Sequence, residues 1–170
     1  MEKKRKEFSK IYDKHIEKIY RFIFVKVSSQ EIAQDLCSET FLRGWEAYRK
    51  TENPGSEIRN IQAFLYQIAR NWITDHYREK GRTEFVSPEM VSIVDPNPGI
   101  EEKMALSSDI DNIRTALVSL GGEYQDVIIY RYLDELSISE IAKIMEKSEG
   151  AVRVALHRAL KSLRTIINKA

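Results

Sequence analysis

The stretch LSISEIAKIMEKSEGAVRVALHRAL, residues 136–160, decides the fold of the C-terminal part of this chain. Its Ser137 and Glu140 form a capping box, which predicts the start of a short helix. Four residues, 146–149, then interrupt the pattern before a longer helix begins. Two helices joined by so short a turn must cross steeply, so the stretch predicts a helix-turn-helix. The apolar side chains predicted to face inward are Ile138, Ile141, Ala142, Met145, Val152, Leu156, Leu160, Leu163 and Ile167.

The outward face of the longer helix is basic. It carries Arg153, His157, Arg158, Lys161 and Arg164. Such a face can enter the major groove of DNA, where arginine contacts guanine through two hydrogen bonds and lysine neutralises phosphate. By charge alone, a solvated face on an ordinary helix hairpin would look the same. The small Ala142 and the β-branched Val152 suit close packing of the two helices, and Ser148 is a good N-cap near which a phosphate can bind. Together with the short turn, these features favour DNA binding.

Outward from this stretch, the N-terminal half predicts three further helices. Residues 8–23 carry an apolar stripe at three- and four-residue steps, and Ser28 with Glu31 forms another capping box. A loop at 50–56 contains proline and glycine, and a third helical pattern runs over 61–79.

Between the two helical regions, the sequence predicts a linker. Residues 81–99 hold three of the four prolines and no helical period. Helical patterns resume near Ile100, and Gly121 with Gly122 ends one of them. The predicted fold class is therefore all-α, with two small helical domains joined by a flexible linker.

Composition narrows the class of protein. A chain of 170 residues with 42% hydrophobic residues can form one domain or two small ones. No apolar run approaches the roughly 20 residues that span a bilayer, and the N-terminus lacks the apolar core of a signal peptide. A single cysteine, Cys37, excludes an internal disulfide framework and a cysteine-rich zinc site. We therefore expect a cytoplasmic protein without direct membrane insertion.

The net charge of +1 hides separate basic and acidic segments. Residues 1–86 carry 17 basic and 13 acidic side chains (net +4), and residues 149–170 carry 5 and 1 (net +4). Residues 87–118 carry 2 and 6 (net −4), and residues 119–148 carry 3 and 6 (net −3). Because salt screens charge beyond about 10 Å, these local sums matter more than the total.

One face of the second predicted helix carries Asp35, Glu39 and Arg43 at four-residue steps. Glu39 and Arg43 are explained as a helix-stabilising pair worth about 0.3–0.5 kcal/mol. An acidic stripe beside Leu36 and Trp45 is equally suited to docking a basic helix of a partner. Periodicity alone does not choose between these interpretations.

The third predicted helix mixes aromatic and basic residues. Its Trp72 and Tyr77 lie close to Arg70, Asn71 and Arg78. Rings stack on unpaired bases and cations follow phosphates, so the mixture suits a single DNA strand as well as a duplex backbone. A place in the core explains Trp72 better than stacking does, whereas Asn71 and Arg78 are better candidates for the surface.

Three segments of the chain resemble a known family. They are DLCSETFLRGW (35–45), NIQAFLYQIARNWITDHYR (60–78) and LSISEIAKIMEKSEGAVRVALHRAL (136–160). In this order and at this size, they resemble a bacterial RNA polymerase sigma factor of the small extracytoplasmic-function (ECF) type, which keeps only regions two and four. The resemblance implies region two at about 5–82, a linker at 83–105 and region four at about 106–170.

The resemblance also implies roles for individual residues. Those expected to bind core polymerase are Asp35, Leu36, Glu39, Arg43 and Trp45. Those expected to bind the minus-ten element, where a base is flipped out, are Arg59, Asn60, Arg70, Asn71 and Arg78. Those expected to read the minus-thirty-five element are Ser148, Arg153, His157, Arg158 and Lys161. The implied partners are core polymerase, promoter DNA and an anti-sigma factor, with no cofactor and no enzymatic activity.

Some positions depart from the family pattern. Ser38 replaces a usual glutamine, while Val154 and Ala155 replace a common serine and arginine, so promoter bases cannot be copied from relatives. Glu146 replaces a frequent glycine in the turn, where a left-handed backbone would carry strain. In the family the acidic linker enters the polymerase channel. A solvated tether explains Glu89, Asp95, Glu101 and Glu102 as well.

Two other classes of protein fit parts of the sequence. A metal-dependent enzyme acting on nucleotides would use Asp35 and Glu39 as Mg²⁺ ligands, but no second acidic cluster of that spacing accompanies them in the N-terminal half. A repressor or response regulator with a ligand-sensing first domain would leave the segments 35–45 and 60–78 without a use.

Overall fold

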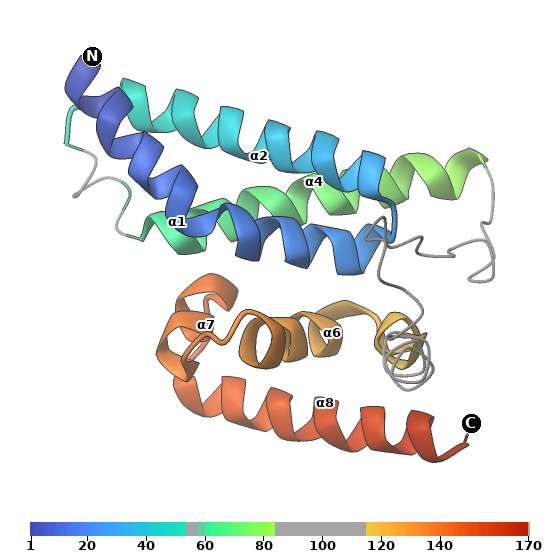
Figure 1. The fold of residues 1–170 in the computed structure, drawn as a ribbon. Coiled ribbons are helices and arrows are strands. Elements are labelled where there is room, and N and C mark those ends of the chain that lie inside the picture. The colour runs from blue at the N-terminus through green and yellow to red at the C-terminus, as the bar shows by residue number, and fades with distance from the viewer. Residues whose placement is uncertain (54–57, 59, 84–114, 170) are drawn as a thin grey trace, which may run out of the picture.

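The computed structural model describes residues 1–53, 58, 60–83 and 115–169, and every regular element among them is a helix. Figure 1 shows two stacked groups of helices. The first contains α1 (Glu2–Val27), α2 (Gln30–Lys50) and α4 (Ile61–Thr83). The second contains a short helix at 115–120, α6 (Gly122–Ile128), the π-helical turn η2 (Ile129–Leu133), α7 (Ile138–Met145) and α8 (Glu149–Lys169). The prediction of an all-α chain with two helical units is confirmed.

The junction of α1 and α2 corrects one prediction. Ser28 does not cap α2; it ends α1 in a left-handed conformation, with φ of 55°, and its N–H donates to the carbonyl of Phe24. The N-cap of α2 is the next residue, Ser29, whose hydroxyl accepts from the N–H of Ile32. The capping box of Ser28 and Glu31 was therefore placed one residue too early, because two adjacent serines both carry a hydroxyl that can cap.

The first unit depends on a close approach between α2 and its neighbours. Phe8 of α1 packs against Trp45 and Tyr48 of α2, with ring centroids 5.4 and 5.6 Å apart. Gly44 of α2 is buried, and a Cβ added there would lie 2.8 Å from Cδ2 of Leu65 and 3.6 Å from the ring of Phe8. The absence of a side chain at Gly44 thus lets α2 pack closely against α4.

Replacing Gly44 with valine should lower the free energy of unfolding by about 2 kcal/mol, because added methyl groups overpack this contact. Denaturant-induced unfolding measures the change. Gly150→Ala is the matched control, because a Cβ there meets no atom within 4 Å and alanine favours helix by about 1 kcal/mol. Equal stability of the valine variant and the wild type would contradict a tight contact at Gly44.

The second unit contains the predicted helix-turn-helix. Ser137 and Glu140 form the capping box at the start of α7, and both Ala142 and Val152 are buried. The break between α7 and α8 is three residues rather than four, since Glu149 already belongs to α8. Of the apolar residues expected to face inward, Ile167 is the exception, because it is 40% exposed in the last turns of α8.

Glu146 adopts the left-handed conformation anticipated for the turn, with φ of 55°. Its place after α7 lets the N–H of Lys147 donate to the carbonyl of Ala142. Ser148 then caps α8, because its hydroxyl accepts from the N–H of Ala151 at 3.1 Å. The turn is therefore closed by hydrogen bonds at both helix ends, which holds α8 at a fixed angle to α7.

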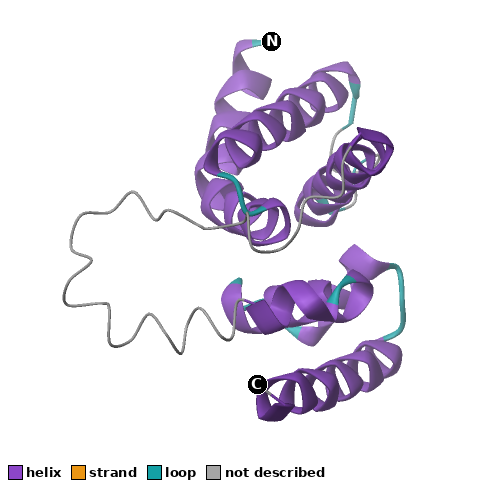
Figure 2. Ribbon diagram, turned by 90° about the vertical axis from the view of Figure 1, so that its right-hand side faces the viewer, coloured by secondary structure: helices purple, strands orange, loops and turns teal. Residues whose placement is uncertain are grey.

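The two units meet through α1 and α4 on one side and through α6, η2 and α7 on the other (Figure 2). An aromatic cluster lies at their contact. Phe22 of α1 stacks on Tyr130 of η2 at 5.1 Å, and Tyr66 of α4 meets the edges of both rings. All three rings are buried, so the contact between the units is continuous with the hydrophobic core.

Candidate nucleic-acid interface

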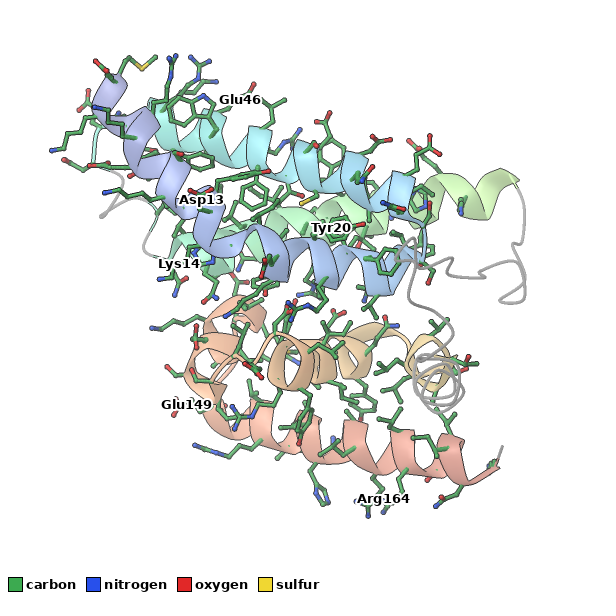
Figure 3. The ribbon with its side chains drawn as sticks, viewed as in Figure 1. Asp13, Lys14, Tyr20, Glu46, Glu149 and Arg164 are labelled. Carbon is green, nitrogen blue, oxygen red and sulfur yellow. The ribbon has the colours of Figure 1, made fainter. Side chains whose placement is uncertain are left out.

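The basic face of α8 is open to solvent. Arg153, His157, Arg158, Lys161 and Arg164 are all exposed. Arg164 points from α8 away from the other helices in Figure 3. The opposite face of α8 holds Val152 and Ala159 in the core, so the buried side of the helix fixes the direction of the basic side. An exposed helix with this chemistry has the form of a major-groove reader.

The N-terminus of α8 adds a second feature to this surface. Ser148 uses its hydroxyl to cap the helix, and the side chain is exposed. A shallow hollow beside the turn is lined by Ser148 together with Lys143 and Lys147. Helix N–H groups and two lysines give this end of α8 a positive potential, which suits a phosphate of a DNA backbone.

The acidic stripe of α2 lies on the surface of the first unit. Asp35, Glu39 and Arg43 are exposed, whereas Leu36 and Trp45 are half-buried and pack against the core. In the part of the chain that the structure describes, no ion pair joins Glu39 to Arg43. The Arg43 guanidinium instead lies 5.0 Å from the ring centroid of Trp72, a cation–π contact. Both carboxylates of α2 therefore remain available to a partner.

Sequence reasoning missed an apolar member of this face. Leu42 is 52% exposed, which is unusual for a leucine in a helix whose other face is buried. It lies three residues after Glu39, so the two side chains are neighbours on the helix surface. The signal was present in the sequence, since Leu42 falls outside the inward set of Phe41, Trp45 and Tyr48. An exposed leucine beside two carboxylates fits a protein partner better than it fits solvent.

The residues predicted to bind the minus-ten element are not alike in this structure. Asn60 caps α4, because its side-chain oxygen accepts from the N–H of Ala63 at 2.9 Å. Asn71 and Arg78 are exposed on α4, as expected. Arg70 forms an ion pair with Asp126 of α6, at 3.4 Å between Nε and Oδ2. Arg59 lies outside the described residues.

Trp72 is half-buried beneath Arg43, and its indole N–H is shielded from solvent without a hydrogen-bond partner among the described residues. Beside Arg70 and Asn71, a groove of about 350 Å³ runs between α4 and the end of α7. Its α4 side is lined by Gln67, Arg70, Asn71 and Thr74, and its α7 side by Ile144, Met145 and Glu146. The second unit therefore covers the part of α4 that was predicted to meet DNA.

Two buried carboxylates of the second unit were not predicted to matter. Asp126 is 3% exposed and forms ion pairs with Lys26 of α1 and Arg70 of α4. Asp134 is fully buried, and its Oδ2 accepts from the hydroxyl of Tyr66 at 2.7 Å. A sequence signal existed for Asp126, which directly precedes the buried run Val127–Tyr130.

The described residues contain no group of three histidine, cysteine, aspartate or glutamate side chains placed to hold a metal ion. Among the same residues, no helix is long and apolar enough to cross a membrane. Cys37 is buried, and burial raises the pKa of its thiol to about 11. The thiol is thus protonated at neutral pH and a poor nucleophile.

Comparison with known protein families gives two matches in chain order. Residues 11–83 match the family model for Sigma-70 region 2, and residues 110–163 match the model for Sigma-70, region 4. The first match covers α1, α2 and α4, and the second covers the helix-turn-helix. The two matched ranges therefore correspond to the two helical units of the structure.

Individual proteins are similar over nearly the whole chain. The ECF RNA polymerase sigma factor BldN of Streptomyces coelicolor is 31% identical over 94% of this chain, which spans 60% of the length of BldN. The ECF RNA polymerase sigma factors SigW and SigM of Bacillus subtilis are 28% and 26% identical, over 92% and 94% of this chain. The matches extend over 87% of SigW and 94% of SigM.

Solved structures share the arrangement of helices. CnrH, in its complex with the cytosolic domain of CnrY, has a TM-score of 0.69 and 18% identity, covering 97% of this chain and 90% of that chain. RpoE of Bartonella quintana, in its complex with the anti-sigma factor NepR, has a TM-score of 0.67 and 19% identity, covering 96% and 98%. At these identities the likeness concerns the fold.

Proposed function

The chain belongs to the sigma-70 family, as an RNA polymerase sigma factor of the ECF type with regions 2 and 4, and from this we propose how its surfaces direct transcription initiation. A sigma factor is an initiation factor and not an enzyme. One observation supports the proposal most strongly: the matched regions present two exposed surfaces of opposite charge, the acidic stripe of α2 and the basic face of α8. The acidic stripe suits a protein partner and the basic face suits DNA.

The α2 surface is proposed to bind core polymerase. Asp35 and Glu39 offer carboxylates to a basic helix of the polymerase, and Leu36 with Trp45 supplies apolar area at the edge of the core. Arg43 is held over Trp72 and shapes the border of this surface. A mixed apolar and acidic patch of this kind gives both affinity and orientation.

The α8 surface is proposed to read the minus-thirty-five element. Arg153, His157 and Arg158 project from the first half of α8 and are exposed, so they can reach base edges, while Lys161 follows the phosphates. Ser148 and the helix N-terminus would hold a backbone phosphate at the edge of the same groove.

The face of α4 is proposed to bind the minus-ten element as a single strand. Asn71 and Arg78 are exposed there, Arg70 lies beside them, and Arg59 and Asn60 precede the helix. We assign region 2 to about residues 5–82, the linker to 83–105 and region 4 to about 106–170. The expected setting is the cytoplasm, with an anti-sigma factor as a further partner.

Run-off transcription tests the proposed function. The purified chain is added to core RNA polymerase and sheared genomic DNA, and the 5′ ends of the transcripts are sequenced. We expect initiation at a small set of sites that share two short elements at fixed spacing, with none from core polymerase alone. Absence of core binding and of new transcripts would overturn the proposal, and turnover of nucleotides by the chain alone would favour an enzyme.

Replacing Arg158 with alanine should lower transcription from the promoters recovered in this assay about tenfold, because one arginine contact to a base contributes about 1–3 kcal/mol. Affinity for core polymerase should stay unchanged, since α8 and α2 are far apart in Figure 1. Lys169→Ala is the control for loss of one exposed charge, because it lies at the other end of the helix. An equal loss in both variants would indicate a general charge effect instead of base reading.

A further inference from the structure

The cationic face where α1 and α4 meet the second unit is occupied by carboxylates of the same chain. Asp126 forms ion pairs with both Lys26 and Arg70, and Asp134 accepts a hydrogen bond from Tyr66. Arg21 of α1 lies 3.4 Å from Oδ1 of Asp134 and donates to the carbonyl of Leu133. Two carboxylates from α6 and η2 thus meet cations on two helices of the first unit.

Arg70 connects this contact to the surface that the chain would use for DNA. Its guanidinium is held by the carboxylate of Asp126, and a carboxylate presents oxygen acceptors to arginine much as a phosphate does. The neighbouring Gln67 donates to the carbonyl of Ile144 at 3.3 Å, and its amide lies 3.5 Å from Oε1 of Glu146. The second unit therefore covers Arg70 and the groove beside Asn71 with acidic and carbonyl groups.

We propose that the face formed by Lys26, Gln67 and Arg70 binds two anionic occupants that exclude each other: the α6–α7 segment of the same chain, as in this structure, and a single strand of DNA. The segment 119–148, with its net charge of −3, then acts as an internal competitor for a nucleic-acid site. The inference rests on the proposed function for the identity of the second occupant. The intramolecular contact itself is observed.

The contact leaves the other two surfaces uncovered. Asp35 and Glu39 on α2 and Arg158 on α8 are exposed in this closed arrangement. The closed chain can therefore approach core polymerase through α2 and DNA through α8, while the α4 face is held back. Separation of the two units is then the step that makes the α4 face available, and a partner that holds the units apart would promote strand binding.

Asp126→Asn is the variant that weakens the contact. It keeps the shape of the side chain but removes the charge shared by Lys26, whose side chain is only 13% exposed, and Arg70. Because a buried cation without its partner is costly, we expect the open population to rise. Glu123→Gln is the matched control, since it removes one negative charge from the same helix but pairs with Lys147 inside the second unit.

Opening is measured in the full chain by energy transfer between dyes on Glu46→Cys and Arg164→Cys, two exposed positions on opposite sides of the molecule (Figure 3). The buried Cys37 should remain unlabelled. Energy transfer should fall in Asp126→Asn and stay at the wild-type value in Glu123→Gln. Unchanged transfer in Asp126→Asn would overturn the role of this ion pair.

Competition is measured, without the dyes, with a fluorescent pool of single-stranded DNA of random sequence. Asp126→Asn should bind the pool about tenfold more tightly than the wild type, and adding Arg70→Ala should remove that gain. An open variant that binds the pool no better than the wild type would overturn the shared site. A positive result without promoter-specific transcripts would refute the proposed function but leave the competition standing.

A locked chain gives the opposite test. Gln67→Cys and Glu146→Cys place thiols on facing sides of the groove, where a reducible bismaleimide cross-linker can join them. The cross-linked chain should bind the DNA pool at least tenfold more weakly than the same chain after reduction. Equal binding before and after reduction would overturn the proposal, since the α4 face would then accept DNA while the units stay closed.

Discussion

Replacing Asp35 and Glu39 together with alanine should weaken binding of the chain to core RNA polymerase by about 100-fold, because two charged contacts at the centre of an interface contribute a few kcal/mol. Both side chains are exposed on α2, and neither takes part in an ion pair among the described residues. Their loss therefore removes contacts to a partner without removing contacts of the fold. Competition between labelled wild type and unlabelled variant for core polymerase measures the affinity.

The control for this prediction lies on the neighbouring helix. Asp13 and Glu17 of α1 are also exposed and also four residues apart, so Asp13→Ala with Glu17→Ala makes the same change in charge. It should leave core affinity within about twofold of the wild type. Both double variants should unfold at nearly the wild-type temperature, since surface substitutions of this kind change stability by about 0.5 kcal/mol or less. Equal weakening in the two variants would refute a specific α2 surface.

The helix-turn-helix was predictable because its signals are local. The capping box of Ser137 and Glu140, the cap at Ser148 and the buried Ala142 and Val152 all lie within one short stretch and depend on neighbours in the chain. The left-handed turn at Glu146 could be anticipated for the same reason. The choice between two adjacent serines at the start of α2 could not, because either one can supply the capping hydroxyl and only the chain reversal after α1 decides.

The closed contact between the units could not be predicted from local signals. Asp126 and Asp134 follow the helical pattern of an ordinary apolar stripe, and their partners Lys26 and Tyr66 are about 100 and 68 residues away. The partner of Arg43 was also mistaken, because spacing favours Glu39 at four residues, whereas the packing of α2 against α4 places Trp72 within reach. In each case a contact distant in sequence overrode the neighbour that spacing suggested.

Asp134 is expected to make the opening of the two units depend on pH. Burial, which outweighs the hydrogen bond from Tyr66 and the nearby charges of Arg21 and Lys18, raises the pKa of this carboxyl from 3.8 to about 6. The pKa is raised in the closed state, so that state binds the proton more tightly than an open state in which Asp134 meets water. The contribution of the proton to closure is complete below pH 3.8 and is lost as the pH rises through 6.

Two pKa units correspond to a change of about 100-fold in the ratio of open to closed chain, of which about tenfold falls between pH 5 and pH 7. His15 opposes this trend, because burial and the charges of Lys14 and Lys18, partly offset by Glu140, lower its pKa. The comparison of wild type with Asp134→Asn separates the two effects, since His15 is common to both. Asparagine keeps an oxygen that can accept from Tyr66, so Asp134→Asn should stay closed at higher pH.

Energy transfer between dyes on Glu46→Cys and Arg164→Cys, followed from pH 5 to pH 7.5, measures the opening of both chains. We expect the ratio of their opening constants to change about tenfold and to level off above pH 7, where the carboxyl is ionised in both states. Tyr66→Phe should raise the open population at every pH, because it removes the hydroxyl that donates to the buried carboxylate. Parallel curves for wild type and Asp134→Asn would mean that Asp134 does not change its protonation when the units separate.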